Sequence, residues 1–292
     1  MSWLQLRFQI PGDRLEQVES WLEDLGALSV TLRDAEDEPL FEPPPGALPV
    51  WRHIKVEALF PAEADPAAIR RELAQRLGHE PLAWSSEALQ DQAWERTWMD
   101  QFEPMRFGER LWIVPSWHEP PEPDAVNLLL DPGLAFGTGT HPTTALCLDW
   151  LDRHPPVAAE VLDFGCGSGV LALAALKLGA RQLVAVDIDE QALVASRDNV
   201  ARNGIDTDRL SLYLPDDFPA DGQYDLVMAN ILAAPLIDLA DKLVSHIRPG
   251  GEIILSGILQ EQADSVMAAY APAVHFADVR QREDWVFLHG KR

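Results

Sequence analysis

A glycine-rich turn near the middle of the 292-residue chain has the spacing to bind a ligand through its backbone. It lies between a short apolar run, Val161–Phe164, and a segment with helical composition, Val170–Leu178. Three alternating glycines make the turn: Gly165, Gly167 and Gly169. Glycine permits a sharp turn and a close approach by a ligand, because no Cβ atom stands in the way. We expect the unpaired N–H groups at the start of the helix to donate hydrogen bonds to an anionic group.

The spacing favours a nucleoside-bearing cofactor other than a dinucleotide. A pyrophosphate-binding turn reads G-x-G-x-x-G, whereas Val170 stands at the place of its third glycine. A second apolar run, Leu183–Asp187, ends in an acid about 20 residues further on, where a carboxylate accepts hydrogen bonds from both hydroxyls of a ribose. The G-x-G-x-G spacing after Asp163 resembles the S-adenosylmethionine loop of class I methyltransferases.

Composition describes an ordinary globular protein with room for two domains. Hydrophobic residues make up 47% of the chain and charged residues 24%. No apolar run approaches the roughly 18 residues of a membrane span, and the first residues lack the pattern of a signal peptide. The two cysteines, Cys147 and Cys166, are too few for a disulfide framework or a metal site. We therefore expect a cytoplasmic protein without a metal or a membrane partner.

The formal net charge of −24 constrains the partners. Such a surface repels phosphate backbones, so direct binding to nucleic acid is disfavoured. It would attract a basic partner, although acidity that only keeps the protein in solution is an equally good interpretation.

Residues 1–88 are predicted to form a small α+β domain. The expected strands are Trp3–Ile10, Ala27–Arg33, Trp51–Phe60 and Leu82–Leu89, and the expected helices are Arg14–Leu25 and Pro66–Leu77. The order β-α-β-β-α-β is that of a ferredoxin-like sandwich. The domain contains no catalytic constellation, so we interpret it as a recognition domain, with a purely structural role as the alternative.

Residues 89–107 are predicted to connect the two domains, partly as a helix over Asp91–Gln101. Trp94 and Trp98 are four residues apart and, with Phe102, are expected to pack against a neighbouring element.

Residues 108–292 are predicted to form a domain in which strands and helices alternate. The expected strands are Val161–Phe164, Leu183–Asp187, Arg209–Leu214, Tyr224–Asn230 and Glu252–Ser256, and the expected helices are Val170–Leu178, Glu190–Asn203, Pro235–Ile247 and Gln260–Tyr270. This alternation predicts a mostly parallel sheet with helices on both faces. A terminal antiparallel pair, Ala273–Arg280 and Asp284–Leu288, completes a seven-stranded, Rossmann-like sheet of the class I methyltransferase type. Ligands of such sheets bind outside the carboxyl ends of the strands, where Asp163, Asp187 and Asn230 all fall.

The segment Leu128–Thr144 is rich in glycine and threonine and precedes a helix expected at Thr144–Leu151. We interpret it as a lid that closes over the cofactor, with contacts from Phe136, Gly137 and Thr138; turn chemistry alone is the alternative. His141 could act as a general base, but a lone histidine in a loop is more often a local hydrogen-bonding residue.

Asn230 closes the fourth strand of the predicted sheet. Its side-chain carbonyl could accept a hydrogen bond from an amine awaiting methylation, or the residue could simply cap the helix near Pro235. Asp216 and Asp217, after the third strand, could accept a hydrogen bond from an adenine amino group, and a solvated acidic turn explains them equally well.

Nearly the whole chain resembles the bacterial ribosomal protein L11 methyltransferases. The most specific matches are the loop Leu130–Thr144 and the sequence Asn230-Ile231-Leu232-Ala233. Further matches are Trp3–Leu6, Trp94–Met99, Met105–Trp112 and Asp163–Gly169. The resemblance implies an N-terminal domain that recognises the ribosomal protein, a flexible linker, and a catalytic domain that methylates lysine side chains and the N-terminal amino group. It also implies that S-adenosylmethionine is bound by Thr144, Gly165, Asp187 and Asn230.

The chemistry requires an unprotonated amine in line with the sulfonium methyl group and shielded from water. Free lysine has a pKa of about 10.4, and desolvation lowers it, so the proton can leave to water without a dedicated base. Asn230 is the predicted catalytic residue. One alternative is methylation of a glutamine amide or an adenine amino group, whose usual Asn-Pro-Pro is replaced here by Asn230-Ile231-Leu232. The other is a non-catalytic protein that binds the ribosomal protein; a monomer is expected in either case.

Overall fold

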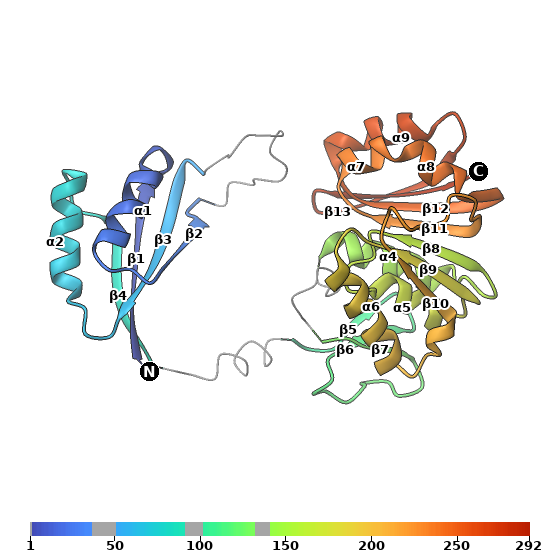
Figure 1. Cartoon of the computed structure of the whole chain (residues 1–292), viewed down its shortest axis with the longest axis horizontal. Coiled ribbons are helices and arrows are strands. Elements are labelled where there is room, and N and C mark those ends of the chain that lie inside the picture. Colours follow the sequence, from blue (N-terminus) through green and yellow to red (C-terminus); the bar gives the residue numbers. More distant parts are fainter. Residues whose placement is uncertain (1, 37–50, 91–101, 132–140) are drawn as a thin grey trace. The chain divides into compact units, whose positions relative to one another are not determined.

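The computed structural model describes residues 2–36, 51–90, 102–131 and 141–292, shown as ribbons in Figure 1. The chain divides into two compact units, Met1–Asp100 and Gln101–Arg292. Each unit has a hydrophobic core of its own. No helix in these described ranges is long and apolar enough to cross a membrane.

The N-terminal unit is a four-stranded antiparallel sheet in the order β2-β3-β1-β4, with two helices. Its elements are β1 (Ser2–Pro11), α1 (Leu15–Asp24), β2 (Ser29–Asp34), β3 (His53–Pro61), α2 (Pro66–Leu77) and β4 (Leu82–Gln90), with a short 3-10 turn at Gly12–Arg14. Alternate residues of β1, such as Leu6 and Phe8, are fully buried in the core. Asp65 caps α2 by accepting from the Ala67 amide, and Gly78 ends it in the left-handed conformation. The predicted order of elements is therefore the observed one.

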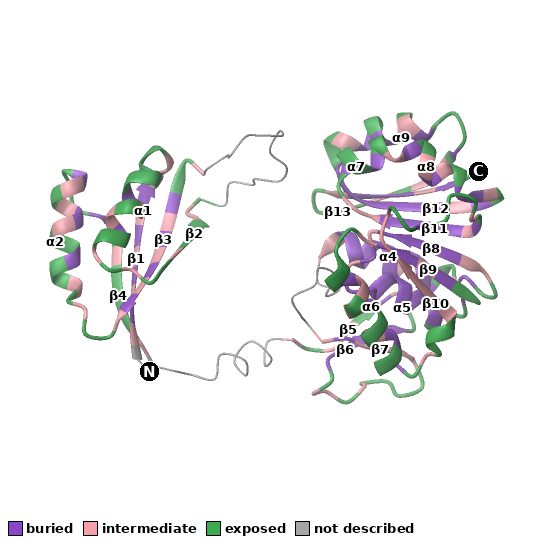
Figure 2. Cartoon of the chain, viewed as in Figure 1, coloured by how far each residue is buried: buried purple, intermediate pink, exposed green. Residues whose placement is uncertain are grey.

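The C-terminal unit is built on a seven-stranded sheet in the order β10-β9-β8-β11-β12-β14-β13. Its strands are β8 (Glu160–Phe164), β9 (Gln182–Val186), β10 (Leu210–Tyr213), β11 (Tyr224–Asn230), β12 (Ile247–Leu259), β13 (His275–Arg282) and β14 (Trp285–Lys291). β14 runs antiparallel to both of its neighbours, β12 and β13, as predicted for the terminal pair. The inner strands, such as β8, β11 and β12, form the buried centre of this unit, coloured mostly purple in Figure 2, whereas the edge strands β10 and β13 are half-buried or exposed.

Helices cover both faces of this sheet, as the alternation predicted. They are α4 (Pro142–Arg153), α5 (Val170–Lys177), α6 (Glu190–Arg202), α7 (Ala233–Asp238), α8 (Ala240–Ser245) and α9 (Ala263–Tyr270), with 3-10 turns at Thr207–Arg209 and Gln260–Gln262. Val161 of β8 packs in the same cluster as α4, α5 and α6, whereas its neighbour Leu162 packs in the cluster of α7, α8 and α9. Because successive strand residues point to opposite faces, one strand anchors both helical layers.

Most predicted bounds differ from the observed ones by a few residues, as for α4, and two elements differ for an identifiable reason. The single helix expected over Pro235–Ile247 is interrupted at Leu239, which leaves helical geometry (φ −95°, ψ 5°) and separates α7 from α8. The strand expected over Glu252–Ser256 continues through Gly257, because this residue accommodates a register shift against β14 at a φ of +86°.

A small three-stranded sheet within the C-terminal unit was not predicted. It consists of β5 (Met105–Phe107), β6 (Leu111–Val114) and β7 (Val126–Leu129), so the end of the predicted linker belongs to this sheet. The turn after β5 is fixed to α4 by Asp152, a side chain only 3% exposed. Asp152 accepts the Glu109 amide at 2.7 Å and the Arg110 guanidinium at 3.2 Å. The helix expected over Asp91–Gln101, with Trp94 and Trp98, lies outside the described residues.

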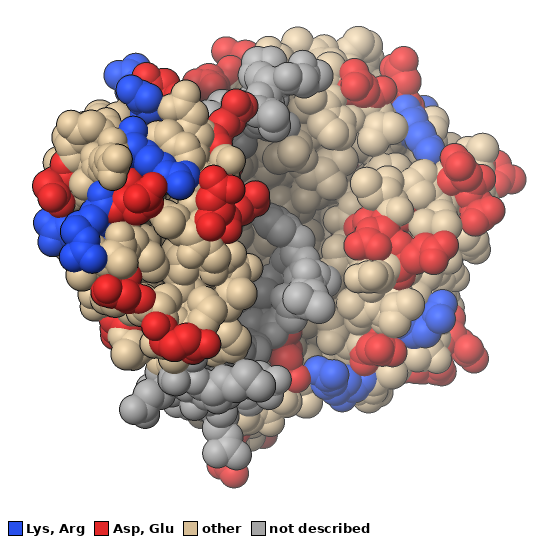
Figure 3. Space-filling view, turned by 60° about the vertical axis from the view of Figure 1, so that its left-hand side comes forward, with Lys and Arg blue, Asp and Glu red and all other residues tan. Residues whose placement is uncertain are grey.

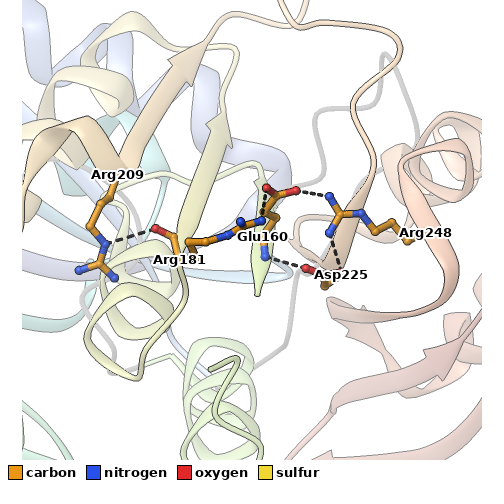
Figure 4. Close-up of polar contacts among 5 residues, drawn as sticks. All are labelled: Glu160, Arg181, Arg209, Asp225 and Arg248. Carbon is orange, nitrogen blue, oxygen red and sulfur yellow. Dashed lines mark hydrogen bonds and ion pairs between the residues drawn. The ribbon is translucent and has the colours of Figure 1, made fainter. Parts of the chain in front are cut away.

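Charged side chains join the amino ends of four strands, at the edge opposite the carboxyl ends (Figure 4). Glu160 at the start of β8 pairs with Arg181 beside β9 and with Arg248 in β12. Asp225 in β11 accepts the Glu160 amide at 2.8 Å and the Arg248 guanidinium at 2.6 Å. Burial alone would raise the pKa of Asp225, but the Glu160 amide and the Arg248 guanidinium outweigh it and hold this pKa below its usual value.

Replacing Asp225 with Asn tests this network. A carboxyl group with a lowered folded pKa stabilises the fold above its unfolded pKa of about 3.9, and this stabilisation disappears as the pH falls through the folded value. We expect Asp225→Asn to lower the free energy of unfolding at neutral pH by about 0.5–1 kcal/mol, since the pair is partly exposed. The difference should be smaller at about pH 3 than at pH 7, because the carboxyl group of Asp225 begins to bind its proton there. Urea unfolding at pH 7 and at about pH 3 measures the free energy of unfolding of the variant and the wild-type protein. Asp198→Asn, on the exposed side of α6, is the control. An equal loss of stability at both pH values would contradict the proposed role of the Asp225 carboxylate.

Candidate functional site

The candidate site lies where the strand order of the seven-stranded sheet reverses direction. From β8 the chain proceeds to β9 on one side, and later returns to β11 on the other side. The loops that follow β8 and β11 therefore diverge at the carboxyl edge, which is the usual ligand position in doubly wound sheets. The glycine turn follows β8, Asp187 follows β9, and Asn230 ends β11. The structure thus brings the predicted residues to one edge.

The turn after β8 requires its glycines for conformational and steric reasons. Gly165, Gly167 and Gly169 have φ angles of +81°, +53° and +75°, which side chains with a Cβ rarely adopt. A Cβ at Gly165 would lie 2.2 Å from Cγ2 of Ile231, and one at Gly169 would lie 2.6 Å from Oγ of Ser196. The alternating spacing seen in the sequence therefore reflects both the turn and its close neighbours.

Asp187 is held by backbone donors on both carboxylate oxygens. Its Oδ2 accepts the Gly167 amide at 2.8 Å, and its Oδ1 accepts the Asp189 amide at 3.0 Å. The side chain is only half-buried, so the remaining lone pairs of this fixed carboxylate can accept hydroxyl groups. Ile188, directly after it, is 85% exposed and offers an apolar surface beside the acid. Sequence reasoning did not single out Ile188, although its position after the acid was a usable signal.

The amides of the turn donate hydrogen bonds within the chain. The predicted anion site concerned the N–H groups at the start of α5 and stays a prediction. The Gly165 and Cys166 amides both donate to the Val186 carbonyl, at 2.7 and 3.1 Å, and the Gly167 amide donates to Asp187. The anionic group bound by the turn is therefore a carboxylate of the protein itself.

Asp163 is a buried acid within the edge of the sheet. Its side chain is 1% exposed, and among the described residues neither carboxyl oxygen has a partner in full hydrogen-bond geometry. Burial raises the pKa of Asp163 to about 7; the Ala172 amide in the first turn of α5 partly opposes this, and the negative charge of Asp187 adds to it. Asp163 was predicted to bind the cofactor, and the structure places it beneath the turn rather than at the surface.

The raised pKa of Asp163 predicts a pH-dependent stability. Between the unfolded pKa of about 3.9 and the folded value of about 7, the folded state holds a proton that the unfolded state releases. The free energy of unfolding should therefore fall as the pH rises through this range, by up to about 1.4 kcal/mol per pH unit. Asp163→Asn cannot titrate, so its urea midpoint should fall less between about pH 5 and about pH 8 than that of the wild-type protein without ligand. Parallel curves for the two proteins would show that Asp163 has an ordinary pKa.

Asn230 and Thr144 lie together although 86 residues separate them. Nδ2 of Asn230 donates to Oγ1 of Thr144 at 3.3 Å, and Thr144 is fully buried in the first turn of α4. This contact commits the amide nitrogen and leaves Oδ1 of Asn230 as an acceptor. The alternative role as a helix cap is not observed, because α7 begins after Leu232 without a side-chain cap.

His141 has a local hydrogen-bonding role. It caps α4, with Nδ1 at 2.8 Å from Oγ1 of Thr143, and its ring packs edge-on against Trp285 at 4.8 Å. Burial lowers the pKa of His141, and the nearby Glu283 only partly opposes this. The histidine is therefore neutral near pH 7, with Nδ1 already engaged.

The remaining predicted contacts have separate outcomes. Asp216 and Asp217 are exposed in the turn after β10, as a solvated acidic turn would be. Phe136, Gly137 and Thr138 lie outside the described residues, so their contacts stay predictions.

A family model described as ribosomal protein L11 methyltransferase (PrmA) matches residues 2–292. The chain belongs to this family. It is 56% identical over 292 residues to a ribosomal protein L11 methyltransferase of Pseudomonas putida, and equally to one of Azotobacter vinelandii, with both chains covered completely in each comparison. A solved structure titled as a ribosomal protein L11 methylase from Lactobacillus delbrueckii subsp. bulgaricus is 35% identical with a TM-score of 0.58, covering 65% of this chain and 98% of that one. These matches confirm the predicted family and enzyme class of this methyltransferase.

Proposed function

We propose that this methyltransferase transfers methyl groups from S-adenosylmethionine to lysine side-chain and N-terminal amino groups of ribosomal protein L11. The observation that carries the proposal is the Asn230 side chain, fixed by Thr144 at the same edge of the sheet as the glycine turn and Asp187. Family membership supports the reaction and the protein substrate. We also propose a cytoplasmic monomer with no direct nucleic-acid partner, in keeping with the net charge of −24 and the acidic side chains spread over the surface in Figure 3.

The described residues fit the cofactor chemically. Asp187 would accept the ribose hydroxyls, because backbone donors hold its carboxylate at the end of β9 and leave lone pairs unused. Ile188 offers an exposed apolar side chain on which a purine could pack. Gly165 and Gly167 have positive φ angles and no Cβ, so a ligand could approach their backbone closely, and Thr144 accepts a hydrogen bond from Asn230. Phe136, Gly137 and Thr138 are proposed to cover the cofactor from the loop before α4.

The reaction requires little acid–base chemistry from the protein. S-adenosylmethionine supplies an activated methyl group when it is bound. Oδ1 of Asn230 would accept a hydrogen bond from the neutral amine and orient its lone pair, while the surrounding apolar residues exclude water. Desolvation lowers the pKa of the amine, whose proton leaves to water before transfer. The neutral, already bonded His141 is not needed as a base.

Asn230→Ala tests the proposed acceptor contact. Loss of one oriented hydrogen bond should slow methyl transfer by about 100-fold, equivalent to about 2.7 kcal/mol. Intact-mass spectrometry of purified ribosomal protein L11, incubated with enzyme and S-adenosylmethionine, measures the rate as mass increments of one methyl group. Binding of S-adenosylhomocysteine to the variant is the control for folding. Unchanged turnover would refute the catalytic role of Asn230.

We propose that the N-terminal unit recognises the protein substrate. Its core is separate from that of the C-terminal unit, and it contributes none of the predicted site residues. Removing residues 1–88 should preserve cofactor binding and abolish most activity on folded ribosomal protein L11. The same mass assay measures methyl transfer to ribosomal protein L11 by the shortened protein, and its cofactor affinity is measured in parallel. Full activity of the shortened protein would mean that the N-terminal unit has another role.

A further inference from the structure

Ile231, directly after Asn230, lies between two glycines with positive φ angles. Gly165 in the cofactor turn has a φ of +81°, and Gly257 in β12 has a φ of +86°. A Cβ at Gly165 would come within 2.2 Å of Cγ2 of Ile231. A Cβ at Gly257 would come within 2.3 Å of the Ile231 carbonyl oxygen and 2.8 Å of its carbonyl carbon. All three distances are shorter than those that real Cβ atoms make. Ile231 can therefore lie this close to positions 165 and 257 only because both are glycine.

We infer that Ile231, held between Gly165 and Gly257, is a positioning residue that fixes the Asn230 side chain at the acceptor side of the site. The Ile231 side chain meets the turn that follows β8, and its backbone meets β12. Neither contact involves Asn230 itself, but both restrict the peptide that carries it. The catalytic importance of the Asn230 position rests on the proposed function. The contacts by which Ile231 fixes that position do not.

A second set of contacts fixes the other side of Asn230. The residue pairs with Ser256 across β11 and β12, and Oγ of Ser256 donates to the Thr143 carbonyl at 3.2 Å. The next residue, Thr144, accepts the Asn230 amide. This hydrogen bond, at 3.3 Å, is long, so it holds the Asn230 side chain only while the adjoining peptide keeps its position. Displacement of Ile231 should therefore move Asn230 away from Thr144.

Two glycines of β12 provide a matched pair of variants. Gly257 and Gly250 have φ angles of +86° and +79°, so alanine imposes a similar backbone penalty at both positions. A Cβ at Gly250 meets nothing within 4 Å, whereas one at Gly257 meets the Ile231 backbone. Any difference between Gly257→Ala and Gly250→Ala therefore reports the displacement of Ile231.

The side chain of Asn230 can be observed directly. The chain has four asparagines, Asn127, Asn199, Asn203 and Asn230, so selective ¹⁵N-asparagine labelling gives four pairs of side-chain amide signals, one pair for each residue. The Asn230 signal is assigned by its absence in Asn230→Ala. We expect Gly257→Ala to shift or broaden this signal beyond its linewidth, while Gly250→Ala leaves it in place. Methyl transfer by Gly257→Ala should fall by about tenfold or more, with S-adenosylhomocysteine affinity nearly unchanged.

A second pair of variants keeps the test decisive if Gly257→Ala does not fold. Ile231→Ala removes the Cγ2 atom that meets Gly165, whereas Ile231→Val retains a branched side chain at this contact. The Asn230 signal should move in Ile231→Ala and stay in Ile231→Val. An Asn230 signal at the wild-type position in Ile231→Ala, and in Gly257→Ala if it folds, would overturn the inference. A displaced signal with an unchanged methylation rate would support the positioning and count only against the catalytic role of Asn230.

Discussion

The site depends on the close approach of two loops that leave the sheet in opposite directions. The turn after β8 and the segment after β11 meet at Gly165 and Ile231, where no Cβ can be accommodated on the glycine. This contact brings the cofactor turn and the acceptor-side asparagine to one edge, although 65 residues separate Gly165 from Asn230, as their numbers show. Parallel strands make the arrangement possible, because their carboxyl ends share an edge and their helices fill the two faces.

Two acids at this edge have different environments and therefore different chemistry. Asp187 is half-buried and held by one backbone donor on each carboxylate oxygen, which leaves lone pairs free to accept hydroxyl groups. Asp163 is almost completely buried, and burial raises its pKa to about 7. A nearby cation would favour its ionised form, whereas Asp187 opposes that form.

Local sequence signals predicted most of the fold. Tyr224–Asn230 and Pro66–Leu77 have the predicted bounds, the latter because Asp65 and Gly78 are unambiguous helix boundaries. Sequence order also placed Asp187 and Asn230 at strand ends. The break at Leu239 and the continuation of β12 through Gly257 depend on tertiary packing and strand pairing, which local periodicity does not reveal. The contacts of Ile231 with Gly165 and Gly257 are long-range for the same reason, as is the pairing of Asn230 with Thr144.

We propose that the cofactor lies across the ends of β8 and β9, with its sulfur directed towards Asn230 at the end of β11. A crystal structure of the protein with S-adenosylhomocysteine tests this claim most directly. We expect both ribose hydroxyls to lie within hydrogen-bond distance of the Asp187 carboxylate. The homocysteine sulfur should lie between the glycine turn and the Asn230 side chain. Electron density for the nucleoside away from Asp187, or a sulfur that does not face Asn230, would contradict it.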